Sequence, residues 1–166
     1  MTDLEMLRHT VATLAYRAAK TMRGAPDSFA DFRPGPTSST PVRIVAHMGD
    51  LFDWALTMVQ GDVKWHNSEP LTWADECARF FAALKRFDDA LADSADAGRP
   101  GAPIGFELTR IFQGPIADAF THTGQLAMLR RLHGCPMKGE SYARADIVIG
   151  RVGPDQTPAN PKYEFD

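Results

Sequence analysis

One carboxylate, one imidazole and one amide lie at helical spacing in the stretch from Gly114 to Gly134. Asp118, His122 and Gln125 lie four and three residues apart, so they share one face if this stretch is a helix. Pro115 suits the first turn of such a helix, and the closing glycine suits its end. A carboxylate and an imidazole one turn apart are either two metal ligands or a buried pair that satisfies its own hydrogen bonds. The function of the chain depends on which of these the pair is.

A second histidine is predicted to face the inside of the molecule from an earlier helix. Thr40 and Pro41 form a good N-cap and first helical position, and the helix is expected to continue to about Gln60. His47 lies on the same stripe as Ile44 and Leu51, which recur at helical spacing. An inward histidine is either a ligand or an ordinary core residue, and the sequence pattern alone does not distinguish them.

These residues need helices to position them, and the periodicity of apolar residues predicts four long ones. The predicted helices span about residues 3–23, 41–60, 71–94 and 114–134, with a short extra helix at about 106–112. Residues 24–41 hold four prolines and form a long loop, which either lies over an active site or is a plain surface crossover. Trp65 and His66 either line the mouth of a cleft or belong to a partly exposed loop, and the loop is the preferred reading. The end of the chain is expected to be an extended tail over the surface.

The predicted fold class is all-α, a single four-helix bundle domain over residues 1–166. The helices are expected to run up-down-down-up, with the long loop after the first helix. The chain has 166 residues, of which 44% are hydrophobic and 23% charged, as in average soluble globular proteins. This length buries enough apolar surface for one domain to fold without disulfides.

Several partner classes are disfavoured by composition. A net charge of -3 gives no basic field for nucleic acid. No stretch of about 18 apolar residues predicts a membrane span, and the first residues do not resemble a signal peptide. The two cysteines, Cys77 and Cys135, lack metal or redox spacing, which favours reduced thiols and a cytoplasmic protein.

The pieces GPI, THTGQL and LRRLHG, together with His47, resemble the DinB-like superfamily of metal-binding four-helix bundles. The resemblance extends over most of the chain. It implies a metal site built from a histidine of the second helix and a late pair of residues four apart, the second of which is followed by x-Gly-Gln. His47 and His122 match two of these ligands.

Asp118 stands where that family usually has the first histidine of the late pair, so the predicted ligand set is His47, Asp118 and His122. Two nitrogens and one carboxylate oxygen with open positions suit Zn²⁺, Ni²⁺, Fe²⁺ or Mn²⁺. No catalytic side chain is predicted beyond these ligands and a metal-bound water. Gln125 either orients a ligand or packs between helices, and Gly124 is expected to allow close helix approach.

The resemblance implies a metal-dependent hydrolase or a thiol-dependent transferase that activates water or a low-molecular-weight thiol. Its partners would be a small-molecule substrate and a second copy of the chain in a homodimer. The replacement of histidine by Asp118 leaves an alternative, a non-catalytic bundle that acts as a binding or dimerisation module. A weaker third reading is a non-haem iron oxygenase, because two histidines and a carboxylate also form a facial triad.

Overall fold

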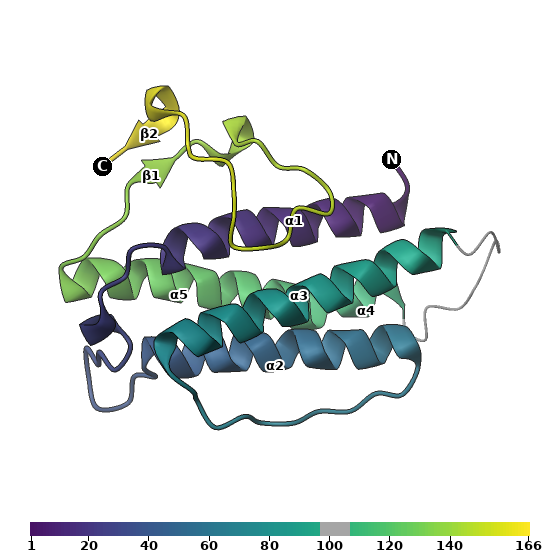
Figure 1. The fold of residues 1–166 in the computed structure, drawn as a ribbon, viewed down its shortest axis with the longest axis horizontal. Coiled ribbons are helices and arrows are strands. Elements are labelled where there is room, and N and C mark those ends of the chain that lie inside the picture. Colours follow the sequence, from purple (N-terminus) through teal and green to yellow (C-terminus); the bar gives the residue numbers. More distant parts are fainter. Residues whose placement is uncertain (97–106) are drawn as a thin grey trace.

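The computed structural model describes residues 1–96 and 107–166, and this part of the chain is mostly helical. Its four long helices are α1 (Asp3–Met22), α2 (Pro41–Gln60), α3 (Trp73–Asp96) and α5 (Ala117–His133). They lie side by side, as Figure 1 shows, and α2 packs most extensively against α3. The prediction of an all-α protein is confirmed, and the bounds of the first three long helices lie within about two residues of those expected.

The direction of the long helices follows the predicted order. In Figure 1, α2 and α3 run the same way, whereas α1 and α5 run the opposite way. Two consecutive parallel helices need a connection as long as a helix. Residues 61–72 supply it by running back along the outside of α2 to the start of α3 (Figure 1).

Threonines begin three of the long helices. Thr2 forms a capping box at the start of α1, and the hydroxyls of Thr40 and Thr72 accept from backbone N–H groups in the first turns of α2 and α3. Gly61 and Gly134 end α2 and α5 with φ of 77° and 84°, a left-handed conformation that favours glycine. The predicted N-cap Thr40 and the predicted helix end at Gly134 are therefore confirmed.

The predicted break before Pro115 is wrong. The helix begins earlier, as α4 (Leu108–Ile111), and continues through a π-helical turn, η2 (Phe112–Ile116), into α5. Proline lacks an N–H, and its ring clashes with the carbonyl four residues earlier in a regular α-helix. A wider π turn accommodates both effects, so Pro115 lies inside a continuous helix and not at its first position.

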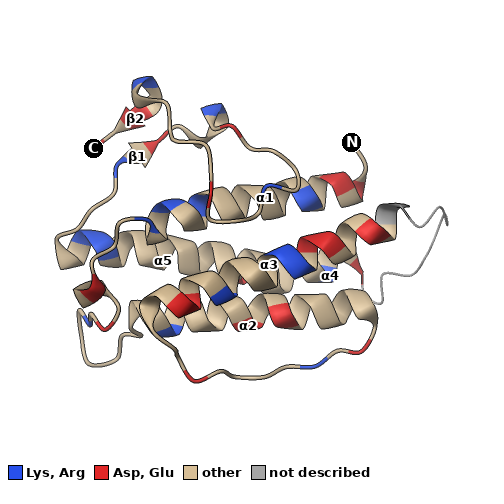
Figure 2. Ribbon diagram, viewed as in Figure 1, with Lys and Arg blue, Asp and Glu red and all other residues tan. Residues whose placement is uncertain are grey.

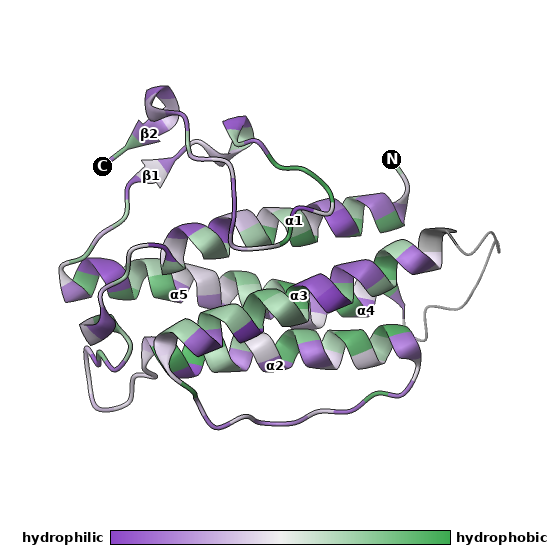
Figure 3. Ribbon diagram, in the orientation of Figure 1, coloured by the Kyte–Doolittle hydropathy of each residue, from purple (hydrophilic) through white to green (hydrophobic). Residues whose placement is uncertain are grey.

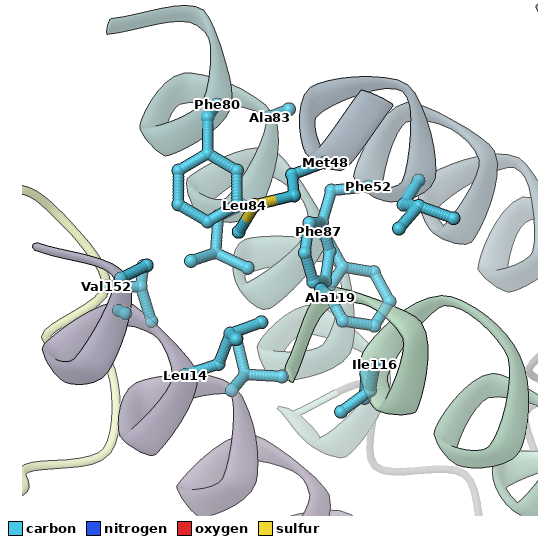
Figure 4. Close-up of a cluster of buried hydrophobic side chains, with 14 of the residues drawn as sticks. Leu14, Met48, Phe52, Phe80, Ala83, Leu84, Phe87, Ile116, Ala119 and Val152 are labelled. Carbon is cyan, nitrogen blue, oxygen red and sulfur yellow. The ribbon is translucent and has the colours of Figure 1, made fainter. Parts of the chain in front are cut away.

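The core lies where the long helices meet. Figure 4 shows Phe52 of α2 and Phe80 and Phe87 of α3 together with Leu14 of α1, all fully buried. Val152 reaches the same cluster from the C-terminal segment. Apolar residues mark all four long helices in Figure 3, as the predicted periodicity requires.

The C-terminal tail covers α1, as expected, but it also contains a short strand pair that the sequence did not predict. β1 (Gly139–Glu140) and β2 (Glu164–Phe165) pair antiparallel. The buried Glu140 carboxylate accepts from Tyr16 Oη at 2.7 Å and from Lys20 Nζ at 2.8 Å. Burial, with the hydrogen bond to Glu140, raises the pKa of Tyr16 above its usual range. The tail is thereby fixed to α1 by buried polar contacts.

Arg130 lies in the last turn of α5, where a cation also interacts favourably with the helix dipole. Its side chain is buried, and the guanidinium donates to four backbone carbonyls, those of Thr21, Arg23, Gly24 and Cys135. It therefore fixes the end of α1 against the end of α5.

Charged residues of both signs are interspersed along α1 and α3 in the view of Figure 2. No helix in the described part of the chain has the length and apolarity that crossing a bilayer requires. Cys77 and Cys135 are both free thiols. Burial, with the nearby Glu76 carboxylate, raises the pKa of Cys77 to about 12, so this thiol stays protonated at neutral pH.

Candidate metal centre

The structure brings together the three side chains that the sequence predicts as ligands. His47 comes from the middle of α2, and Asp118 and His122 come from the first two turns of α5. One oxygen of the Asp118 carboxylate lies 3.3 Å from His47 Nε2, and the other lies 3.5 Å from His122 Nε2. The two imidazole rings are 4.9 Å apart, nearly perpendicular to each other. All three ligand atoms thus surround one small space.

His47 Nε2 and Asp118 form a long hydrogen bond of 3.3 Å, and the separations of Asp118 from both histidines are also close to those between ligands of one cation. Bonds of about 2.0–2.2 Å in tetrahedral geometry place neighbouring ligand atoms about 3.4 Å apart. A charge-assisted hydrogen bond between imidazole and carboxylate is shorter, about 2.7–2.9 Å. The two distances from the Asp118 carboxylate, 3.3 and 3.5 Å, are close to the tetrahedral edge.

Gln125 orients one of the two histidines. Its Oε1 lies 2.8 Å from His122 Nδ1, so Nδ1 carries the proton and donates to the amide. In the neutral ring this leaves Nε2 with a lone pair that faces the Asp118 carboxylate. Two acceptors that face each other repel unless a cation lies between them. The amide therefore selects the tautomer that a metal ligand requires.

The group is more open to solvent than the sequence indicated. The side chains of His47 and Asp118 are 36% and 45% exposed, and that of His122 is 18% exposed. The expectation of a fully interior site is wrong in this respect. Leu132 of α5 is also exposed. His122 and Gln125 line an open hollow, so solvent reaches this face of α5.

Gly124 does not allow a close helix approach, contrary to the sequence interpretation. A methyl group built at this position meets no atom within 4 Å, and the residue lies on the exposed side of α5. Glycine inside a helix without such a contact only adds conformational entropy to the unfolded chain.

We expect Gly124→Ala to raise the free energy of unfolding by about 0.5–1 kcal/mol, because alanine has the higher helix propensity. Urea denaturation measures the change. Gly134→Ala is the matched control on the same helix. Its φ of 84° penalises any side chain, so the control should lose about 1–2 kcal/mol. A loss of stability in Gly124→Ala would show that a neighbour approaches this face after all.

Trp65 forms an aromatic wall next to the metal centre, a placement that the sequence did not resolve. Its ring lies 5.6 Å from that of His47 and 5.6 Å from that of Trp54, edge to face in both cases. Trp65 is 43% exposed. The indole therefore restricts the motion of His47 and shields one side of the candidate centre.

A buried ionic network holds the connection that carries Trp65. The Asp50 carboxylate accepts from the backbone N–H and the hydroxyl of Ser68, at 2.9 and 2.7 Å. Arg79 of α3 donates to Asp50 at 2.9 Å and to Glu76 at 2.8 Å, and Glu76 also accepts from the Leu71 N–H. Burial opposes ionisation of Asp50, but the hydrogen bonds from Ser68 and the Arg79 guanidinium outweigh it and hold its pKa below the usual range.

A second group of possible ligands, Asp50, Asp53 and His66, occurs at this network. His66 Nε2 lies 3.1 Å from Asp50 and 3.6 Å from Asp53. Arg79 and Arg86 already contact these carboxylates at 2.9 and 2.7 Å. Because the guanidinium groups supply the positive charge, we assign this group a structural role.

Residues 24–41 form the expected loop, and its last part borders the metal centre. Thr37, Ser38 and Ser39 line the same open hollow as His122 and Gln125. Of the two readings of this loop, the structure favours a loop that lies beside the candidate site.

Comparisons with protein-family models, with curated proteins and with solved structures find no match. The resemblance to DinB-like proteins therefore rests on the sequence motifs alone. The geometry of His47, Asp118 and His122 stands independently of it.

Proposed function

We propose that this chain is a metal-dependent enzyme of the DinB-like class, a four-helix bundle that holds a divalent cation between α2 and α5. His47, Asp118 and His122 would be its ligands. The observation that carries the proposal is the convergence of these three side chains, whose ligand atoms all lie within 4.8 Å of one another. The candidate ions are Zn²⁺, Ni²⁺, Fe²⁺ and Mn²⁺.

The reaction proposed is hydrolysis or thiol-dependent group transfer. When bound, the cation would supply Lewis acidity that activates a water molecule or a thiol and polarises a carbonyl. The residues of the chain have simpler tasks. Gln125 fixes the tautomer of His122, and Trp65 restrains His47 and excludes water on one side. The exposure of Asp118 supports access by a small molecule from solvent.

Elemental analysis of the purified protein tests the metal site. We expect about one equivalent of a divalent transition metal per chain, and less than about a tenth of that in His47→Ala and in His122→Ala. His9→Ala is the control, because His9 lies on α1 and belongs to neither group of possible ligands. Circular dichroism should show that each variant keeps its helices.

Unchanged metal content in both ligand variants would eliminate the site. An equal loss in His9→Ala would indicate non-specific binding and would also contradict the proposal. The absence of any bound metal, even after incubation with each of the four ions, would favour the non-catalytic bundle.

A further inference from the structure

An open hollow of about 460 Å³ lies directly beside the candidate metal centre. His122 and Gln125 form the wall that the hollow shares with the centre. This volume is within the range of small-molecule sites, about 300–1,000 Å³. The remaining walls are formed by residues 37–39 of the first loop, Ile44, Met128 and Leu129.

The walls have two chemical characters. Ile44, Met128 and Leu129 form the aliphatic part of the lining, and Thr37, Ser38 and Ser39 of the loop contribute hydroxyl groups. This loop wall is held in place. The Ser38 N–H donates to Gly35 O at 3.1 Å, and Arg33 donates to Ser38 O at 2.8 Å. A ligand with an aliphatic part and a neutral polar part would match both parts of the lining.

The charge around the centre argues against an anionic ligand. A second hollow, of about 400 Å³, lies on the Asp118 side and includes Trp54, Gln113 and Thr121. Among the described residues that line the two hollows, the ionisable side chains are those of Asp118 and His122. No lysine or arginine occurs among these lining residues. A carboxylate or phosphate bound away from the metal would lose hydration without gaining a cationic partner.

Resting on the proposed function, we propose that the hollow beside His122 binds the aliphatic acyl group of an uncharged ester or amide, which the metal centre hydrolyses. In this reaction water gives its hydroxyl to the acyl carbon and its proton to the leaving group as the C–O or C–N bond breaks. His122 and Met128 are six residues apart on α5, or about 9 Å along the helix axis. An acyl chain of about six carbons spans most of this distance.

Three hydroxamic acids test the class of ligand, because they share one metal-binding head. Acetohydroxamic acid has a short chain, hexanohydroxamic acid ends in a methyl group, and adipic monohydroxamic acid ends in a carboxylate. Calorimetry on the zinc-loaded protein should show hexanohydroxamic acid binding at least about tenfold more tightly than either of the others, since each fully buried methylene contributes about fourfold. Equal affinities, or tighter binding of the carboxylate, would overturn the proposal; the latter would point to Arg33 or Arg43 as a partner.

Met128→Lys tests the position of the chain end. Met128 is 58% exposed, so the change should not disturb folding, and it places a cation in the aliphatic wall. The preference for the methyl-ended over the carboxylate-ended ligand should fall at least about fivefold. Leu132→Lys is the matched control. Leu132 is 57% exposed one turn further along α5 and does not line the hollow. An equal effect of both variants would contradict the proposal.

A measurement without metal separates the hollow from the metal site. With methionine methyl groups labelled, hexanamide should shift the Met128 resonance in the metal-free protein, and acetamide at the same concentration should shift it much less. Met128→Leu assigns the resonance. If the protein takes up none of the four ions but still shows the hexanamide shift, the metal centre is contradicted and the acyl site is kept. If the protein binds metal but shows neither the shift nor a preference for chain length, the acyl site is contradicted and the metal centre is kept.

Discussion

Arg79→Met is expected to lower the free energy of unfolding by about 3–5 kcal/mol, because it leaves buried carboxylates without their cation. Asp50 and Glu76 are 3% and 0% exposed, and both contact the Arg79 guanidinium. The variant also removes the donor to Ala46 O. Urea denaturation at pH 7 measures the loss. The long side chain of methionine keeps most of the packing, so that charge is the main change.

Arg86→Met is the matched control for this prediction. Arg86 also lies on α3 and also pairs with an aspartate of α2, Asp53, at 2.7 Å. Its side chain is 52% exposed, however, and exposed ion pairs contribute about 0–1 kcal/mol. Losses of similar size in the two variants would show that the buried network contributes no more to the free energy of unfolding than an exposed ion pair.

The same network predicts a pH dependence with a defined sign. The pKa of Asp50 is depressed in the folded protein, so its contribution to stability is present above the unfolded pKa, about 4, and is lost as the pH falls through the folded value. In Arg79→Met the carboxylate loses part of this stabilisation. The gap in stability between wild type and variant should therefore narrow as the pH falls below about 4. A gap that stays constant would mean that charge is not the cause.

The helices could be predicted because their signals are local. Thr2, Thr40 and Thr72 cap helices through hydrogen bonds to residues three positions later, and such pairs are visible in the sequence. The directions of the helices were expected as part of the four-helix bundle fold class. Pro115 was misread because a π turn and a helix start both tolerate proline, and only the packing of the neighbouring turns decides between them.

The grouping of the three candidate ligands could be predicted from the sequence, but their exposure to solvent could not. His47, Asp118 and His122 were found from helical spacing together with the resemblance, and the structure places them in one group. Their exposure depends on which elements cover α5, and periodicity does not report that. For Trp65 the sequence left two readings open, the mouth of a cleft and a partly exposed loop. Its position against His47 is set by bonds from Ser68 to a buried aspartate, 18 residues apart in sequence.

Zinc should raise the melting temperature of the wild-type protein by about 8–16 °C when free metal is a thousandfold above its dissociation constant. The reason is linkage: a ligand that binds only the folded state adds about 4 kcal/mol at that concentration. For a domain of this size, 1 kcal/mol corresponds to about 2–4 °C. Calorimetry with a zinc buffer, and again after chelation, measures the shift.

Two substitutions at Asp118 make this measurement specific for the site. Asp118→Asn keeps the shape of the side chain but removes the charge that bridges His47 and His122, and most of the shift should disappear. Asp118→His replaces the oxygen donor by a nitrogen donor, as in the three-histidine pattern of the DinB-like superfamily, and should retain the shift. In the chelated state all three proteins should melt within a few degrees of one another, because Asp118 is half-exposed and contributes little to the fold. A full shift in Asp118→Asn would remove the carboxylate from the ligand set, and a shift lost in both variants would show that the aspartate acts through local structure and not as a ligand.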